Sequence, residues 1–188
     1  MTVDFGFFAP AEVGNFVFKT CDVFGVQNGS ETPVEGATVS LTDGTGGAVT
    51  DIFGDPIADI VTGADGIYTF VNLFPGDYKL TFDLPASPTG LDFGPVDAAA
   101  DDIDSDVDPA TSMSPVFTLV SGEFRDDIDA GLIDVEDPTF TVPANLSVAC
   151  DGDHSPLATG DVTDEADNCA LNLEATFEDE ENLSLIHI

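Results

Sequence analysis

The most concentrated set of side chains capable of chemistry is an acidic run between Asp97 and Asp108. Within it, Asp102, Asp104, Asp106 and Asp108 recur at every second position. In an extended or looped backbone, this spacing places several carboxylates on one side. Calcium takes about six to eight oxygen ligands from carboxylates, carbonyls and water. The run therefore indicates a calcium site, while a solvated acidic loop is the alternative that spacing alone leaves open.

A catalytic constellation is not found. His154, in an Asp-Gly-Asp-His-Ser stretch, is the only central histidine, and His187 lies close to the C-terminus. A nucleophile–base–acid triad needs a histidine held by a folded scaffold, whereas a turn-like stretch is typical of an exposed loop. Zinc is also disfavoured, because no Cys-x-x-Cys occurs and the histidines are scattered. We predict that the chain is not an enzyme.

The charge balance excludes whole classes of partner. The 188 residues include 3 Lys and Arg against 37 Asp and Glu, a formal net charge of −34. Such a surface repels nucleic acids and anionic lipids and attracts cations. A hydrophobic fraction of 43%, with 15 Phe, argues against disorder, because disordered acidic chains are poor in apolar residues. We expect a folded protein with an acidic surface that binds calcium ions.

No segment is apolar enough to cross a bilayer, so we expect no membrane insertion. Residues 1–14 lack the basic and apolar regions of a signal peptide. If the protein is secreted, this chain is expected to be an internal piece of a longer one. Residues 183–188 carry no acid and break the local pattern, which indicates a non-native tail; a strand of the second module is the alternative.

Short alternating segments predict strands and leave almost no room for helices. The segments are Val13–Lys19, Ala37–Leu41, Gly66–Leu73, Tyr78–Leu84, Val116–Val120, Ile128–Ile133, Thr139–Val142 and Leu146–Ala149. Turn dipeptides such as Asn28-Gly29 and Asp65-Gly66 separate them. This pattern is typical of an all-β, antiparallel, immunoglobulin-like β-sandwich with a partial second β-sandwich module.

A polar hinge that ends at Pro138 marks a module boundary near Asp134. We therefore expect a lead-in at 1–12, a β-sandwich at 13–134, a partial module at 135–180 and the tail at 181–188.

Residues 13–134 resemble the B-type repeat of serine–aspartate repeat surface proteins. The segments that carry the resemblance are 13–17, 34–39, 64–70, 73–78, 104–109 and 127–132, and their order and spacing are more specific than any one alone. The resemblance implies a collagen-adhesin B-type sandwich in which 64–78 forms a central hairpin. It also implies that the 102–108 loop, with Asp129 from the last strand, binds calcium.

The same resemblance implies a second, EF-hand-like calcium loop at Thr20–Glu31. Asp22, Asn28 and Glu31 keep ligand-type side chains, whereas Thr20 and Phe24 depart from the family pattern. Phe cannot ligate a metal, so a structural loop without metal is an equal alternative.

Residues 138–180 resemble the first half of a hyalin-type immunoglobulin-like repeat. The segments that carry it are 138–146, Cys150, Thr163-Asp164 and 166–169. The resemblance implies a disulfide between Cys150 and Cys169, with Cys21 left as a free thiol.

These features predict an extracellular or cell-surface location in a modular bacterial protein. The chain is expected to be a calcium-stabilised structural or adhesive module. Its partners would be calcium ions, neighbouring modules of the same chain, and an extracellular protein or polysaccharide. A non-catalytic accessory module of a secreted polysaccharide-active enzyme is the alternative.

Overall fold

The computed structural model describes residues 6–21, 24–29, 31–100, 103–144, 152, 155, 160 and 162–169. All regular elements among them are strands, which confirms the predicted all-β class. The part of the chain so described holds no helix long and apolar enough to span a membrane. The chain divides into two compact units, Met1–Val135 and Glu136–Ile188.

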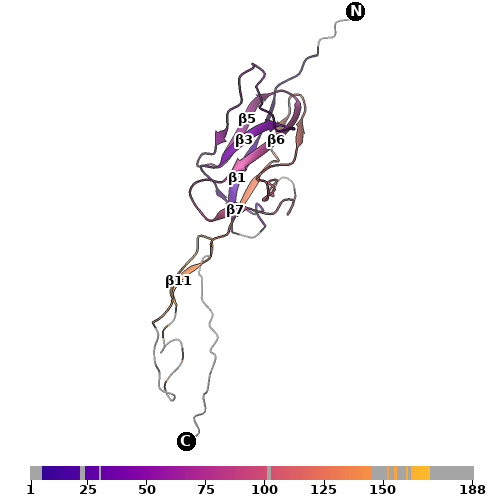
Figure 1. Cartoon of the computed structure of the whole chain (residues 1–188). Helices are drawn as coiled ribbons and strands as arrows, with labels where there is room; N and C mark the ends of the chain where they lie inside the picture. Colours follow the sequence, from indigo (N-terminus) through magenta and orange to yellow (C-terminus); the bar gives the residue numbers. More distant parts are fainter. Residues whose placement is uncertain are drawn as a thin grey trace, which may run out of the picture. The chain divides into compact units, whose positions relative to one another are not determined.

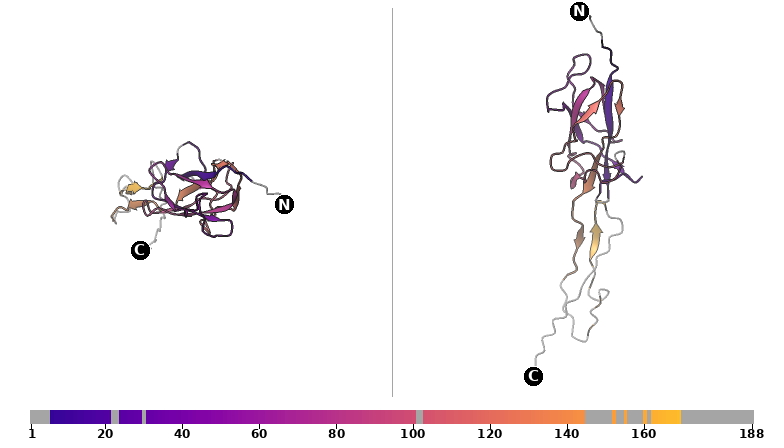
Figure 2. Two further views of the ribbon diagram at one scale, coloured as in Figure 1. Left: turned by 90° about the horizontal axis from the view of Figure 1, so that it is seen from above. Right: turned by 90° about the vertical axis from the view of Figure 1, so that its right-hand side faces the viewer.

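The first unit is a sandwich of two sheets (Figures 1 and 2). Its strands are β1 (Ala11–Thr20), β2 (Thr32–Pro33), β3 (Thr38–Asp43), β4 (Ile60–Val61), β5 (Ile67–Leu73), β6 (Gly76–Asp83), β7 (Leu91–Phe93), β8 (Phe117–Leu119), β9 (Phe124–Arg125) and β10 (Ala130–Asp134). β1 begins at Ala11, so the segment predicted as a lead-in already contributes two residues to the sheet.

One sheet is organised by β1, which changes partners along its length. Its first half pairs antiparallel with β5 and parallel with β9. Its second half pairs antiparallel with β2 and parallel with β10, and β7 extends the sheet beyond β10. The sandwich is therefore mostly antiparallel, with parallel pairing where β1 meets the last strands.

The second sheet has the order β4-β3-β6-β8, with all pairs antiparallel. Alternate residues of β6, among them Tyr78, Leu80 and Phe82, are buried between the sheets. They meet inward-facing residues of the first sheet such as Val13 and Tyr68 in one core. The alternation read in the sequence thus reports which face of each strand is buried.

The prediction that residues 64–78 form a central hairpin is wrong. β5 pairs with β1, and β6 pairs with β3 and β8, so the two strands belong to different sheets. The short link between them, Phe74 and Pro75, passes from one layer to the other. Asn72, just before it, has φ of 59°, and its carbonyl accepts a hydrogen bond from the Ile52 amide instead of a β6 partner.

The second unit contains β11 (Thr139–Thr141) and β12 (Thr163–Ala166), which pair antiparallel. β11 lies within the predicted strand Thr139–Val142. The predicted strand Leu146–Ala149 falls outside the described residues.

Gly66 lies where β1 changes partners, and a substitution there tests how closely the backbone is packed at this position. Its φ is +68°, and an added Cβ would contact the Val17 carbonyl oxygen and lie 3.1 Å from the Val34 amide nitrogen. We expect Gly66→Ala to reduce the free energy of unfolding by about 3 kcal/mol, because the left-handed conformation and the backbone clash both oppose it. Denaturant unfolding would measure the change.

Gly46→Ala is the matched control. Gly46 also has a positive φ, +89°, but an added Cβ would meet nothing within 4 Å. The control should reduce the free energy of unfolding by only about 1 kcal/mol, the cost of the left-handed conformation alone. Equal losses in the two variants would contradict the predicted backbone clash.

Candidate functional site

Asp129 fills a gap in the hydrogen bonding of β1. On one edge of β1, Val13 is opposite Arg125 of β9 and Val17 is opposite Ala130 of β10. No strand residue is opposite the stretch between them. There the Phe16 amide donates to Asp129 Oδ1 at 3.1 Å, so a side chain satisfies a main-chain donor that a strand would otherwise bind.

Two further carboxylates lie at this gap. The Asp129 amide donates to Asp106 Oδ2 at 2.7 Å, and the Asp106 amide donates to the Asp129 carbonyl at 2.9 Å. Asp104 is 2% exposed, and its Oδ2 accepts from the Ala99 amide at 2.9 Å. Asp129 itself is fully buried. We call Asp104, Asp106 and Asp129 the carboxylate cluster.

Gln27 joins the cluster from the other predicted calcium loop. Its Nε2 donates to Asp129 Oδ2 at 2.9 Å, and its amide donates to the Ile103 carbonyl at 2.6 Å. Gln27 is held there by a close backbone contact. A Cβ on Gly131 would lie 2.6 Å from the Gly25 carbonyl oxygen, and a Cβ on Gly94 would lie 3.0 Å from the Gly25 Cα. Glycine at these positions lets the loop reach the cluster.

Two buried groups at the cluster have raised pKa values, mainly because they are buried. Burial, reinforced by the charges of Asp106 and Asp104, raises the pKa of Asp129 from 3.8 to about 7, although the Phe16 amide and the Gln27 side chain oppose the shift. Burial also raises the pKa of the Tyr68 hydroxyl well above 10, with added repulsion from Asp129 and Asp106. Tyr68 keeps its proton and donates it to the Ile128 carbonyl at 2.6 Å.

The structure brings together only part of each predicted ligand set. Asp104, Asp106 and Asp129 meet, but Asp108 is exposed, and its Oδ1 accepts from the Ala110 amide within its own turn. In the other loop, Glu31 Oε1 accepts from the amides of Asn28 and Gly29. Asp102 and Asp22 lie outside the described residues.

The described residues alone do not complete a metal site. Among them, no group of three or more acidic, His or Cys side chains is placed to hold an ion. The donor chemistry is nevertheless of the type that calcium prefers, namely carboxylate, amide and main-chain oxygens. Gln27 was missed in the sequence because it falls between the ligand positions of the EF-hand pattern.

The cysteines differ from the prediction. Cys21 and Cys169 are each disulfide-bonded, so the prediction that Cys21 is a free thiol is wrong. Cys150 lies outside the described residues. Because the chain has 3 Cys and both Cys21 and Cys169 are bonded, the implied pairing of Cys150 with Cys169 is wrong as well.

With this geometry in place, comparison with known proteins decides the family. The model of the SdrD B-like domain matches residues 11–132. The chain belongs to this family. It is a family of structural, non-enzymatic domains, in agreement with the predicted lack of catalysis. The match ends before the second unit, where the hyalin-type resemblance stays a prediction.

Relatives of the SdrD B-like domain are parts of long proteins. Serine-aspartate repeat-containing protein D of Staphylococcus aureus (strain Newman) is 28% identical over 133 residues, covering 66% of this chain and 9% of the relative. Serine-aspartate repeat-containing protein E of S. aureus (strain MSSA476) is 31% identical over 132 residues, covering 68% of this chain and 11% of the relative. The chain therefore spans about a tenth of these relatives.

Among solved structures, the chain is similar to GBS52, the minor pilin of Streptococcus agalactiae. The TM-score is 0.46 at 17% identity, covering 73% of this chain and 49% of that chain.

The raised pKa of Asp129 predicts an unusual pH dependence. Between its unfolded value near 3.8 and its folded value of about 7, Asp129 keeps a proton in the folded state that it loses on unfolding. The folded state then binds more protons, so the free energy of unfolding falls as pH rises, by up to about 1.4 kcal/mol per pH unit. We expect the melting temperature in chelator to fall between pH 5 and pH 7.5.

Asp129→Asn should flatten this slope, because Asn keeps an acceptor for the Phe16 amide and cannot titrate. Asp126→Asn, at an exposed acid three residues earlier, is the control and should keep the slope. Thermal unfolding at several pH values measures both. A wild-type slope that persists in Asp129→Asn would assign the titration to another group.

Proposed function

We propose that this chain is a calcium-stabilised structural or adhesive module of a secreted, multidomain bacterial surface protein. Membership of the SdrD B-like domain family supports a structural role, and the fold offers a compact unit suited to repetition along a chain. The module would act through its rigidity and its surface, holding neighbouring modules apart or presenting a binding face to an extracellular protein or polysaccharide.

The observation that best supports calcium binding is the burial of several carboxylates close to one another. Asp129 and Asp104 are almost completely buried, Asp106 is hydrogen-bonded to Asp129, and each of the three can carry a negative charge. The hydrogen bonds that oppose the raised pKa of Asp129 come from neutral donors, the Phe16 amide and the Gln27 side chain. A divalent cation would offset this repulsion.

Calcium would then act on loops rather than on the core. Asp104, Asp106 and Asp129 are not placed to hold an ion by themselves, so the proposed site also needs a predicted ligand outside the described residues, Asp102. Gln27 would bring the 24–29 segment to the site. The ion's chemistry is to bridge carboxylates that otherwise repel one another. The three carboxylates are already held in position, because each accepts a hydrogen bond from a main-chain amide. The result would be a stiffened end of the sandwich.

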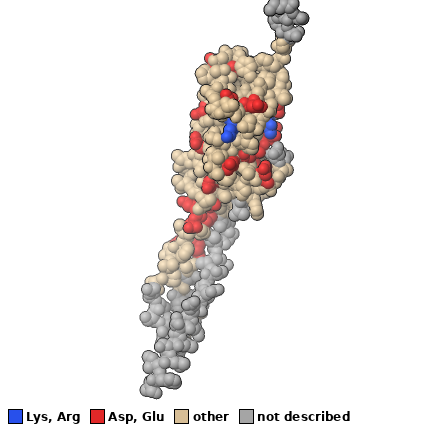
Figure 3. All heavy atoms as spheres, turned by 45° about the vertical axis from the view of Figure 1, so that its right-hand side comes forward, with Lys and Arg blue, Asp and Glu red and all other residues tan. Residues whose placement is uncertain are grey.

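The molecular surface supports a role among cations. On the face seen in Figure 3, acidic side chains are spread over the described residues, and Lys or Arg form two small patches. With a net charge of −34, general screening by salt will also stabilise the protein, so any test of calcium must separate specific binding from screening.

The test compares calcium with sodium at equal ionic strength. We expect millimolar calcium to raise the melting temperature by several degrees more than sodium, because an ion at about a hundredfold excess over Kd stabilises by about 2.7 kcal/mol. EDTA should reverse the shift. The combined variant Asp104→Asn and Asp106→Asn should lose most of the calcium-specific part.

The control variant is Asp59→Asn with Asp83→Asn, which removes the same charge from exposed positions outside the cluster. It should respond to calcium like the wild type. Equal stabilisation of all proteins by calcium and sodium would leave only a solvated acidic surface and reject the metal site.

A further inference from the structure

β8 has one free edge, and the direction of its main-chain groups can be deduced. β8 ends the order β4-β3-β6-β8, so among the described strands it pairs with β6 alone. Thr118 is opposite Asp77, whose carbonyl is turned away from β8 and accepts from the Gly44 amide at 2.8 Å. Opposite residues of an antiparallel pair share their bonding direction. The amide and carbonyl of Thr118 therefore point away from β6.

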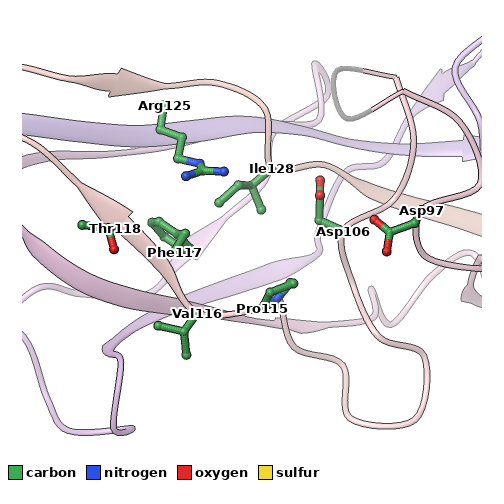
Figure 4. Close-up of a pocket in the computed structure, with 8 residues that line it drawn as sticks. All are labelled: Asp97, Asp106, Pro115, Val116, Phe117, Thr118, Arg125 and Ile128. Carbon is green, nitrogen blue, oxygen red and sulfur yellow. The ribbon is translucent and has the colours of Figure 1, made fainter.

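A cleft lies along this part of the strand. It has a volume of about 370 Å³ and runs between β8 and the 125–128 segment of the other sheet. Its walls include Pro115, Val116, Phe117 and Ile128, which are apolar (Figure 4). An extended segment added beside β8 would pair with outward main-chain groups and place alternate side chains against these walls.

The two ends of the cleft differ in charge. At one end, Arg125 is already occupied: its Nε lies 2.7 Å from Asp127 Oδ1, and its guanidinium lies 5.5 Å from the centre of the Phe117 ring. At the other end, Asp97 and Asp106 both line the cleft (Figure 4). One oxygen of Asp106 accepts from the Asp129 amide. The exposed carboxylate of Asp97 is therefore the group at this end that is offered to a cationic side chain.

Asp97 is the residue that gives this end its character. It is exposed, and it lines both this cleft and an adjoining one of about 330 Å³ that continues past Pro115 toward Lys79. Its φ is +52°, a left-handed conformation that is unfavourable for a residue with a Cβ.

We propose that the cleft beside β8 binds an extended peptide segment bearing Lys or Arg by strand addition. The segment pairs with the free edge at Thr118, packs an apolar side chain over Phe117 and Ile128, and directs a basic side chain to Asp97. Charge complementarity selects the occupant, because the net charge of −34 disfavours a second copy of this chain and attracts a basic partner. This surface goes beyond the calcium cluster and does not require it.

The probe is the peptide acetyl-Lys-Val-Lys-Val-Lys-Val-amide at 150 mM salt, followed by NMR and by amide hydrogen exchange. We expect saturable binding, with shifts and new exchange protection at the Val116 and Thr118 amides. Asp97→Asn should weaken binding about three- to fivefold, as expected for an exposed ion pair. Asp59→Asn, which removes one exposed acid just before β4 at the opposite edge of the same sheet, should leave binding unchanged.

Two further peptides separate strand addition from attraction by net charge. The same peptide with alternate amides N-methylated keeps its charge but cannot pair, and it should not bind; the Glu-Val analogue should not bind either. Equal binding of the N-methylated peptide, or equal effects of Asp97→Asn and Asp59→Asn, would overturn the proposal. So would sedimentation showing that the protein alone dimerises with protection at Thr118.

Each measurement is made with calcium and with EDTA. Asp106 lines the cleft and also belongs to the carboxylate cluster, whereas Asp97 does not. Strand addition directed by Asp97 should therefore persist when the cluster is empty. Loss of the calcium response with retained peptide binding would reject only the metal site.

Discussion

The unpaired stretch on one edge of β1 is the constraint on which the acidic end of the sandwich depends. β1 is bound on this edge first by β9 and then by β10, and the chain between those strands leaves the sheet at residues 126–129. A buried amide without a partner is costly. The Asn15 side chain donates to the Asp126 carbonyl, and the Phe16 amide donates to Asp129 Oδ1. The carboxylate is thus held at this position by the requirements of the backbone.

Fixing Asp129 there determines what surrounds it. A buried carboxylate needs further donors, and Gln27 supplies one through the close approach of Gly25 to Gly94 and Gly131. Asp106 enters through its reciprocal main-chain and side-chain bonds with Asp129. Each contact is favourable locally, yet together they place carboxylates close to one another in a poorly solvated site. The raised pKa of Asp129 reports that conflict.

The alternating strands could be read from the sequence because burial of one face leaves a period of two. This holds for Val13–Lys19 and Tyr78–Leu84, which correspond to β1 and β6. The two- or three-residue strands β2, β4, β7 and β9 were missed, since so few residues show no period. The β5–β6 link was misread as a hairpin because a Pro-Gly-Asp turn signal does not distinguish a return within one sheet from a step between sheets.

The candidate site was less predictable for a similar reason. Even spacing suggested that Asp108 would join Asp104 and Asp106, but the chain turns at Asp108, whose carboxylate accepts from its own turn. Gln27 carried no signal, and Asp97 stood out only as the start of the acidic run, because their roles come from contacts between distant segments. The sequence therefore indicated the chemistry of the loops, while only the fold shows which oxygens meet.

Protons and cations are alternative responses to the same surplus of negative charge at Asp129. A carboxyl with a pKa of about 7 takes up a proton under mildly acidic conditions, which relieves repulsion with Asp104 and Asp106. A nearby divalent cation favours the charged form and would lower that pKa, so the two ligands compete. The calcium affinity of the proposed site should therefore rise as pH rises through neutrality. In that range Asp129 loses its proton, so repulsion among the carboxylates is strongest in the protein without calcium.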